Sequence, residues 1–431
     1  MRKLLLTLVL ALLAVAIGAQ DVREELRANP SLSASNYMAY PGPKQRQLTP
    51  PPAGMRPFYL SHYGRHGSRW HSRISMYDAP FLTLARADSL GKLTPLGRDV
   101  MGRLDRLRHD AENRWGELTP LGARQQRDIA RRMVERFPEL FEGAARVEAR
   151  STQVARCMLS MENALLELLR MNPRLDIWSD ATHRDMEYLN FQDKRLMALK
   201  FNKPAKALYD DYSKQRADCR RLMGVLFSDT AYVSHHVNGA ELGMQLLIVA
   251  AIVQNTELRD EVTLYDIFTA DEVYRMWQIG NARWYIGWGA APVNGAVQPY
   301  TQRNLLRRLL ADADSCIASG QTNVQLRFGH DTVVLPLVCL LDIDGYGVTT
   351  DLERLEDCGW VNYRIFPMSC NLQFVFYRRH AADRDVVFKV LLNENEATLP
   401  LPGTMAPYYR WSDFRSYCLS KLEAFVESGA E

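Results

Sequence analysis

Two apolar segments far apart in the chain each run directly into a loop that contains a histidine, and this repeated pattern constrains the fold more than any other feature. Residues 58–63 have the composition of a β-strand and lead to Arg65 and His66, and residues 324–328 lead to His330. Functional side chains gather at strand ends in α/β sheets. We therefore expect both segments to be strands of a sheet whose ends bring the two histidines to one site.

Further segments have strand patterns. Residues 146–150 alternate between polar and apolar side chains and precede apolar residues at helical spacing from 152 to 169. Residues 372–377 and 386–392 are separated by a charged connection and are typical of an antiparallel pair. The chain is therefore predicted to have an α/β fold, with a mixed, mainly parallel sheet flanked by helices and interrupted by a mainly helical lobe.

The sequence Leu-Thr-Pro-Leu-Gly occurs twice, at residues 93–97 and 118–122. Thr is favoured at a helix N-cap, and Pro is favoured at the first helical position. Each copy is expected to begin a helix. The repeat reflects capping and does not indicate a duplicated domain.

The domain organisation follows from a change of pattern along the chain. Residues 176–296 are mainly helical in pattern and rich in Met, Tyr and Trp, so they are expected to form a helical insert lobe. Residues 20–175 and 297–431 are expected to form one discontinuous α/β domain. Residues 20–56 are rich in proline and are typical of an extended lead-in.

Residues 1–19 have the features of a secretory signal peptide. Two basic residues precede an apolar stretch, residues 4–17, which is too short to span a membrane, and the small residues Gly18 and Ala19 follow. We expect cleavage after Ala19, with cleavage after Gly18 as the alternative, and export to the periplasm or the extracellular medium. No later apolar run has the length of a transmembrane helix, so no transmembrane segment is expected.

The charge and the cysteines limit the possible partners. The formal net charge is +3 and falls to +1 when the two basic residues of the signal peptide are removed. Nucleic-acid-binding domains are usually much more basic, so no nucleic-acid partner is expected, and any attraction for an anion must be local. The seven cysteines are an odd number, and their spacing resembles no zinc site, so neither a disulfide pairing nor a metal site is predicted. The oligomeric state is not indicated.

His66 lies between Arg65 and Arg69 directly after a predicted strand. Neighbouring cations repel one another, and burial of a histidine among them is unfavourable, so stability alone does not explain the arrangement. A phosphate dianion between the arginines would explain it, because planar guanidinium groups match phosphate oxygens in bidentate geometry. His66 would then be placed to attack phosphorus as a nucleophile.

A phosphate ester also needs a proton for its leaving oxygen, and Asp331 offers a carboxyl group at the second strand end. His330 would add a hydrogen-bond donor to the phosphate. Arg156 lies in the first turns of a predicted helix, where the helix dipole also favours anions. The structural alternatives for these residues are a helix N-cap, a loop histidine and a solvent-exposed arginine.

The order of these motifs resembles the histidine acid phosphatases, the larger branch of the histidine phosphatase superfamily. The resemblance covers most of the chain after the signal peptide and rests on Arg-His-Gly-Ser-Arg at 65–69, Arg-Cys at 156–157 and His-Asp at 330–331. The first two motifs and residues 390–394 look most like multiple inositol polyphosphate phosphatases. Those enzymes usually carry His-Ala-Glu where this chain has His-Asp, which is the pattern of many phytases and general acid phosphatases.

The resemblance implies a role for each of these residues. His66 would become a phosphohistidine that water later hydrolyses, and Asp331 would protonate the departing alcohol. No metal or other cofactor is implied. Four side chains would bind the phosphate: Arg65, Arg69, Arg156 and His330.

The implied partner is a small phosphate ester, most specifically an inositol polyphosphate such as phytate. His71 and Arg73 follow the nucleophile loop and are possible specificity residues that would hold phosphates not being cleaved. Two alternatives remain open. One is a broad-specificity acid phosphatase, and the other is a non-catalytic relative that binds phosphate without turnover.

Overall fold

The computed structural model describes residues 22–402 and 405–427. The predicted signal peptide, residues 1–19, lies outside the described residues. All seven cysteines lie within them as free thiols, and only Cys358 is exposed.

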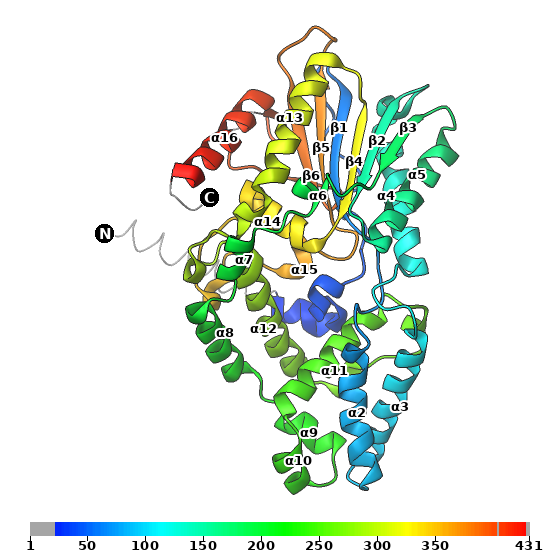
Figure 1. The fold of residues 1–431 in the computed structure, drawn as a ribbon, viewed down its shortest axis with the longest axis vertical. Helices are drawn as coiled ribbons and strands as arrows, with labels where there is room; N and C mark the ends of the chain where they lie inside the picture. Colours follow the sequence, from blue (N-terminus) through cyan, green and yellow to red (C-terminus); the bar gives the residue numbers. More distant parts are fainter. Residues whose placement is uncertain (1–21, 403–404, 428–431) are drawn as a thin grey trace.

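One eight-stranded sheet forms the centre of the fold, with the strand order β3-β2-β4-β1-β5-β6-β7 and with β8 paired to β6 (Figure 1). Four strands run parallel: β1 (Arg56–Arg65), β2 (Arg146–Ser151), β3 (Asp176–Asp180) and β4 (Val324–Gly329). Four strands pair in antiparallel fashion: β5 (Asn371–Arg378), β6 (Val387–Leu392), β7 (Asn395–Ala397) and β8 (Tyr409–Arg410). The predicted mixed α/β sheet is confirmed. Parallel pairs do not predominate, however, because β5, β6 and β7 are joined by short connections that need no crossover helix.

The middle strand, β1, brings the two predicted loops together. It pairs with β4 in parallel, with Arg65 opposite Gly329, and on the far side of β4 lies β2, whose Ser151 is opposite Phe328. The carboxyl ends of parallel strands meet at one edge of a sheet. The residues that directly follow β1, β2 and β4 therefore lie close together.

Helices cover both faces of the sheet (Figure 1). Successive side chains of a strand point to opposite faces, so Leu60 and Tyr59 of β1 belong to two different hydrophobic cores. The core around Leu60 is covered by α4 (Pro120–Arg136) and α5 (Ala155–Met171). The core around Tyr59 is covered by α13 (Arg303–Ser319), α14 (Asp331–Leu341) and α16 (Trp411–Glu427).

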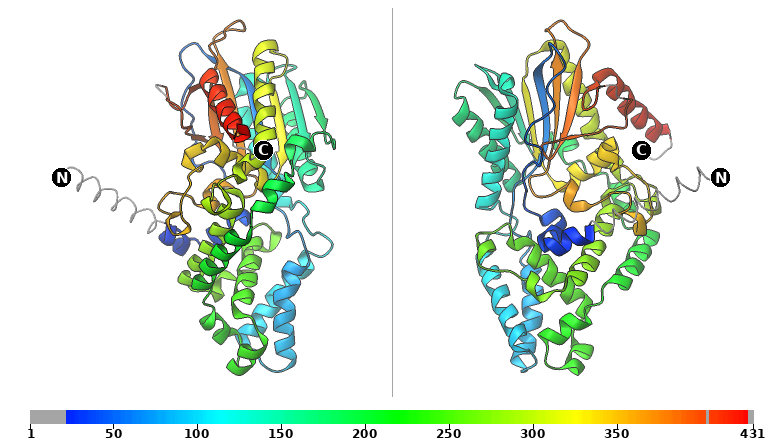
Figure 2. Two further views of the ribbon diagram at one scale, coloured as in Figure 1. Left: turned by 60° about the vertical axis from the view of Figure 1, so that its left-hand side comes forward. Right: turned by 180° about the vertical axis from the view of Figure 1, so that it is seen from behind.

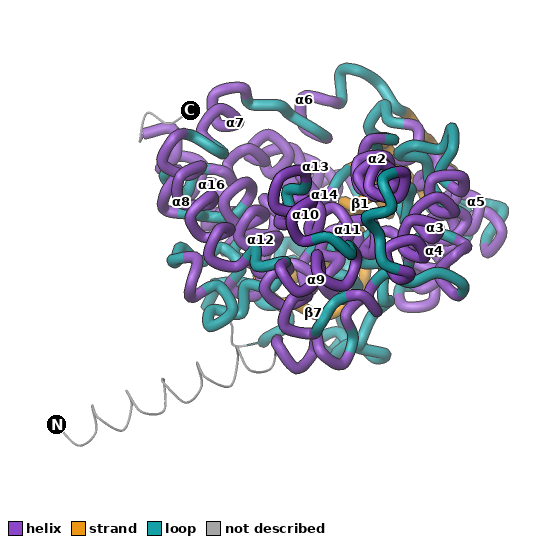
Figure 3. The backbone as a smooth tube through the Cα atoms, turned by 90° about the horizontal axis from the view of Figure 1, so that it is seen from below, coloured by secondary structure: helices purple, strands orange, loops and turns teal. Residues whose placement is uncertain are grey.

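The opposite end of the molecule is a helical lobe, seen end-on in Figure 3. Its longer members are α2 (Ser75–Ser89), α3 (Pro95–Asp110), α8 (Lys203–Arg216), α9 (Arg220–Leu226), α10 (Thr230–His236), α11 (Gly239–Val253) and α12 (Ala270–Trp288). Leu84 and Leu104 share one core with Leu222 and Leu246, so α2 and α3 pack with helices of the predicted insert. The sequence pattern predicts residues 75–110 as part of the discontinuous α/β domain. Helical periodicity reveals the apolar face of a helix, but it does not reveal which partner covers that face.

Three short α-helices also lie within the described residues: α6 (Met186–Leu189), α7 (Lys194–Leu199) and α15 (Asn362–Ile365). Within the described residues, no single helix has the length and apolar character needed to cross a membrane. Helices α10 and α11 meet these criteria only as a pair bent by 90°.

The predicted extended lead-in is partly helical. It contains a 3-10 segment, η1 (Pro30–Tyr37), which begins with a proline and is capped by the side chain of Asn29. This segment lies between the sheet and the helical lobe (dark blue in Figure 2) and contacts α11, α12 and α15. The composition predicts the break from regular structure, but not the position of the segment at the middle of the molecule.

Both copies of Leu-Thr-Pro-Leu-Gly begin helices as predicted. The Thr94 hydroxyl accepts a hydrogen bond from the Gly97 amide at 3.0 Å, and the Thr119 hydroxyl accepts one from the Gly122 amide at 3.2 Å. Gly122 has a second role, since a Cβ atom there would lie 2.2 Å from the carbonyl oxygen of Ser68. The start of α4 therefore touches the loop that carries His66.

We predict that Gly122→Ala disturbs the His66 loop. The added methyl group has no room against Ser68, so the loop must shift, and overpacking of this kind destabilises by about 1–3 kcal/mol. The melting temperature should fall, and so should the rate of the phosphate-ester hydrolysis that the sequence leads us to expect. Gly102→Ala on α3 is the matched control, because a Cβ atom there meets nothing within 4 Å. It should leave the rate unchanged and should not lower the melting temperature, since Ala is favoured over Gly within a helix. Equal behaviour of the two variants would contradict the predicted contact.

Candidate active site

His66 and His330 face each other at the carboxyl edge of the sheet. The His66 amide donates to the carbonyl oxygen of Gly329 at 3.0 Å, and the two imidazole centroids are 5.8 Å apart. The Nδ1 atom of His66 lies 2.8 Å from the carbonyl oxygen of Gly67. Because a carbonyl oxygen only accepts, Nδ1 carries the proton and Nε2 keeps its lone pair. The Nε2 atom is therefore the nucleophilic atom of this ring.

Three arginines surround His66 with incompletely bonded guanidinium groups. The Nε atoms of Arg65, Arg69 and Arg156 are buried and have no hydrogen-bond partner among the described residues. Backbone carbonyl oxygens hold each group in place: Arg65 donates to Asn36 at 2.5 Å, Arg69 to Trp70 at 2.8 Å and Arg156 to Gly116 at 3.4 Å. Buried donors without acceptors are unfavourable. Oxygen atoms of a bound anion would satisfy them.

Burial and the surrounding positive charges keep both histidines neutral. Burial, followed by Arg65, Arg69 and Arg156, lowers the pKa of His66 well below its ordinary value. Burial, followed by Arg156, lowers the pKa of His330 to about 4. A neutral imidazole is required for attack on phosphorus. His66 therefore keeps its nucleophilic form under mildly acidic conditions.

Asp331, the first residue of α14, lies in the same site. Its Oδ2 atom is 2.9 Å from Nη2 of Arg65 and accepts a hydrogen bond at 3.0 Å from the amide of Asn36. Burial alone would raise the pKa of Asp331, but Arg65, Asn36 and Arg69 together lower it below its ordinary value. The carboxyl group is therefore ionised in the free protein. Phosphate binding to the arginines would weaken their hold on it and favour its protonation.

The structure thus brings six of the predicted site residues together, and the two possible specificity residues follow the His66 loop, one of them buried and the other exposed. His71 is fully buried, its Nε2 atom lies 3.1 Å from the carbonyl oxygen of Ile248, and its ring packs edge-on against Tyr37 and Tyr77. Burial, followed by Arg69, lowers its pKa to about 3, so it is neutral. The prediction of a cation at the pocket mouth is therefore wrong for His71. Arg73 is exposed just before α2.

Two polar residues of the site are not among those predicted from the sequence. Asn36 reaches Asp331 from the predicted lead-in, and the hydroxyl of Thr152 lies 3.3 Å from Nε2 of His330. Asn36 is separated from its partner by most of the chain. Thr152 follows β2 and could have been found as the polar residue at a third strand end.

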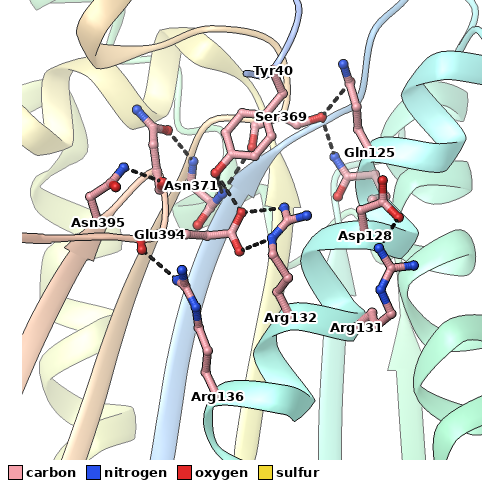
Figure 4. A network of polar contacts seen from close by, with 12 residues as sticks. Tyr40, Gln125, Asp128, Arg131, Arg132, Arg136, Ser369, Asn371, Glu394 and Asn395 are labelled. Carbon is pink, nitrogen blue, oxygen red and sulfur yellow. Dashed lines mark hydrogen bonds and ion pairs between the residues drawn. The ribbon is translucent and has the colours of Figure 1, made fainter. Parts of the chain in front are cut away.

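Helix α4 supports the loop that carries His66. Oε1 of Gln125 accepts hydrogen bonds from the Ser68 amide and the Ser369 hydroxyl, both at 2.9 Å (Figure 4). Gln126 donates to the carbonyl oxygen of Arg65 at 3.1 Å, and the Ser369 amide donates to the carbonyl oxygen of His66 at 3.1 Å. The loop is thus fixed from two sides by groups that do not carry charge.

The same helix is anchored further along by a partly buried ion pair. Arg132 forms two hydrogen bonds with Glu394, at 2.7 and 2.8 Å, and the Tyr40 hydroxyl donates to the same carboxylate at 2.8 Å (Figure 4). Glu394 lies in the turn between β6 and β7 with a φ of 64°. This position gives the segment 390–394 a structural role, because Glu394 links the edge of the sheet to the helix that supports the nucleophile loop.

Comparison with known proteins agrees with this geometry. The sequence profile of the histidine phosphatase superfamily (branch 2) matches residues 109–393. The chain belongs to this superfamily. The members to which it is similar are phosphoric monoester hydrolases, and this chain is one as well. The matched region includes Arg156, His330 and Asp331, whereas the His66 loop precedes it.

The individual relatives share only a small fraction of identical residues with this chain. The chain is 22% identical to multiple inositol polyphosphate phosphatase 1 of Gallus gallus over 93% of this chain and 88% of that protein. The fold resembles the multiple inositol polyphosphate phosphatase of Bifidobacterium longum in complex with phosphate, with a TM-score of 0.74 and 17% identity over 90% of this chain and 97% of that one. It also resembles the phytase of D. castellii, with a TM-score of 0.65 and 13% identity over 91% of this chain and 85% of that one.

The buried histidines predict how stability depends on pH. The pKa values of His62 and His71 are lowered by burial to about 3, and those of His66 and His330 are lowered as described above. Unfolded histidines bind protons below about pH 6.5, whereas these folded ones do not, so acidification favours the unfolded state. The free energy of unfolding should fall between pH 7 and 5, by up to about 1.4 kcal/mol per pH unit for each histidine.

Chemical denaturation at several pH values measures this slope. His62→Gln should reduce the slope of the free energy of unfolding against pH by the contribution of one histidine, even if the variant is less stable overall. His183→Gln replaces an exposed histidine and should leave the slope unchanged. A slope that does not change in His62→Gln would show that His62 is not held neutral by the fold.

Proposed function

We propose that this protein is an exported phosphomonoesterase that hydrolyses inositol polyphosphates of the phytate type through a phosphohistidine. The observation that carries the proposal is the geometry around His66: an unprotonated Nε2 atom surrounded by three arginines with unsatisfied donors, and a carboxyl group within the same site. Export rests on residues 1–19, whose composition is that of a signal peptide.

The reaction follows from this arrangement in two steps. His66 Nε2 attacks phosphorus, the P–O bond to the alcohol breaks, and the leaving oxygen takes the proton of Asp331. The guanidinium groups neutralise the phosphoryl oxygens as charge shifts in the transition state. Water then attacks the phosphohistidine and gives a proton to the Asp331 carboxylate, which releases inorganic phosphate and restores His66.

The His66 assignment is tested by removal of the imidazole. His66→Ala should lower kcat by about three orders of magnitude or more, because the covalent route is lost while the arginines remain. Rapid quenching of the unmodified enzyme with a labelled substrate should trap an acid-labile phosphoenzyme that the variant does not form. Substantial turnover by the variant would exclude His66 as the nucleophile. Phosphate binding without turnover by the unmodified protein would indicate the non-catalytic alternative.

A polyanionic substrate is supported by the names of the relatives. Multiple inositol polyphosphate phosphatases and phytases recur among proteins with this fold, and one such structure, the Bifidobacterium longum enzyme, was determined with inositol hexasulfate. Arg65, Arg69 and Arg156 lie around His66 on a chain whose formal net charge is only +3. That distribution suits a ligand with several phosphate groups.

Broad-specificity hydrolysis is the second candidate, and two observations favour it. His330 and Asp331 form the His-Asp pattern of general acid phosphatases. In addition, a cavity of about 520 Å³ beside Asn36 is lined mainly by apolar and aromatic side chains such as Met244 and Trp284, with Arg283 as the arginine among its described lining residues. Such a lining suits less highly charged alcohols.

Hydrolysis of inositol hexakisphosphate and glycerol phosphate at several salt concentrations separates the two candidates. For a polyphosphate-specific enzyme, kcat/KM should be higher for inositol hexakisphosphate, and added salt should raise its KM more steeply, because exposed charges are screened beyond ~8 Å at physiological ionic strength. Arg73→Ala should raise the same KM, with Arg86→Ala in α2 as a charge-matched control. Equal kcat/KM values for both substrates would identify a general acid phosphatase.

A further inference from the structure

Segment η1 forms part of the active site although it precedes the whole sheet in sequence. It lies between the sheet and the helical lobe (Figures 1 and 2). Tyr37 places its ring 5.5 Å from the guanidinium carbon of Arg69, and the side chain of Asn36 is buried beside Asp331. A segment whose composition predicts only a linker therefore contacts two of the predicted site residues.

Asn36 bonds to both members of the Arg65–Asp331 ion pair. Its amide Nδ2 donates to Oδ2 of Asp331 at 3.0 Å, and its backbone carbonyl oxygen accepts from Nη1 of Arg65 at 2.5 Å. The Oδ2 atom of Asp331 thus has two polar partners: Nη2 of Arg65, in an ion-pair contact at 2.9 Å, and Nδ2 of Asn36, which donates a hydrogen bond. Arg65 is a cation that a phosphate group would engage. Asn36 is a neutral amide, whose attraction for a dianion is weaker than that of a guanidinium.

The carboxyl group is therefore expected to lose one of these partners, Arg65, during the reaction. When a phosphate dianion engages Arg65, the carboxyl group loses its charged partner, and Asn36 stays as the neighbouring side chain that can fix its orientation. A leaving oxygen can take a proton only from a group held within hydrogen-bond reach. Without Asn36, the Asp331 side chain would keep only the hydrogen bond from the Thr332 amide to Oδ1, at 2.9 Å, and its Oδ2 atom would have no partner to orient it.

We propose that Asn36 is a positioning residue for leaving-group protonation, which holds the Asp331 carboxyl group toward the departing ester oxygen after phosphate has engaged Arg65. The inference rests on the proposed function. It concerns only the proton-transfer step, so phosphate binding and attack by His66 proceed without the Asn36 side chain. The contact from Asn36 to Arg65 uses the backbone, and a side-chain substitution leaves it in place.

The test compares substrates whose leaving groups differ in basicity. Asn36→Ala should lower kcat on glycerol phosphate by about 10- to 100-fold, but by less than about 3-fold on p-nitrophenyl phosphate, whose leaving group needs little proton donation. Asp331→Asn should show the same selectivity. The double variant should be no worse than Asp331→Asn alone, since residues that act in one step are not additive.

Ser33→Ala, in the same segment, is the matched control and should change neither rate. Calorimetric titration with inorganic phosphate should give an affinity for Asn36→Ala within about 3-fold of the unmodified protein, which also shows that the variant is folded. An equal loss on both substrates, or a further loss in the double variant, would overturn the role of Asn36.

The outcomes also separate this inference from the proposed function. If His66→Ala abolishes turnover and Asp331→Asn is selective but Asn36→Ala is not, only the role of Asn36 fails. If Asp331→Asn itself shows no selectivity, the general-acid assignment fails and the Asn36 inference fails with it. If His66→Ala retains activity, the phosphohistidine mechanism fails.

Discussion

Three buried guanidinium groups around one neutral histidine are the interaction on which the rest of this structure depends. Among the described residues, the charge of Arg65 is met by Asp331, while Arg69 and Arg156 are held by backbone carbonyl oxygens. A buried positive charge without an ionic partner is unfavourable, and neighbouring guanidinium groups also repel one another. A bound anion would relieve both effects, which favours its binding. Burial and the same charges lower the pKa of His66 and keep it unprotonated, so the arginines contribute both to anion binding and to the nucleophilic form of His66.

The scaffold supplies the rigidity that such an arrangement requires. The His66 loop is confined by the start of α4, where Gly122 leaves no space for a side chain, and by uncharged donors and acceptors from Gln125 and Ser369. Helix α4 is in turn tied to the far edge of the sheet through Arg132 and Glu394. Neutral contacts near the histidine and an ion pair further away keep extra charge out of the site.

The sequence predicted the parts of this site that follow a local rule. Strand composition followed by a polar loop located His66 and His330, and threonine–proline capping located α4, because both signals lie within a few residues. The role of Asn36 and the packing of α2 against the helical lobe depend on contacts between distant segments, which no local pattern encodes. His71 was misplaced for a related reason: a histidine close to a cationic loop is exposed or buried according to what packs over it.

The central position of β1 has a consequence for the order of folding. This strand is among the first elements of the chain, yet both of its neighbours, β4 and β5, come from the last third, with Leu60 opposite Val324 and Val375. Pairings between such distant residues close large loops and form slowly. The nucleophile loop therefore has no fixed geometry until residues up to about Arg378 have joined the sheet, and a chain that ends earlier would carry His66 without a site to hold it.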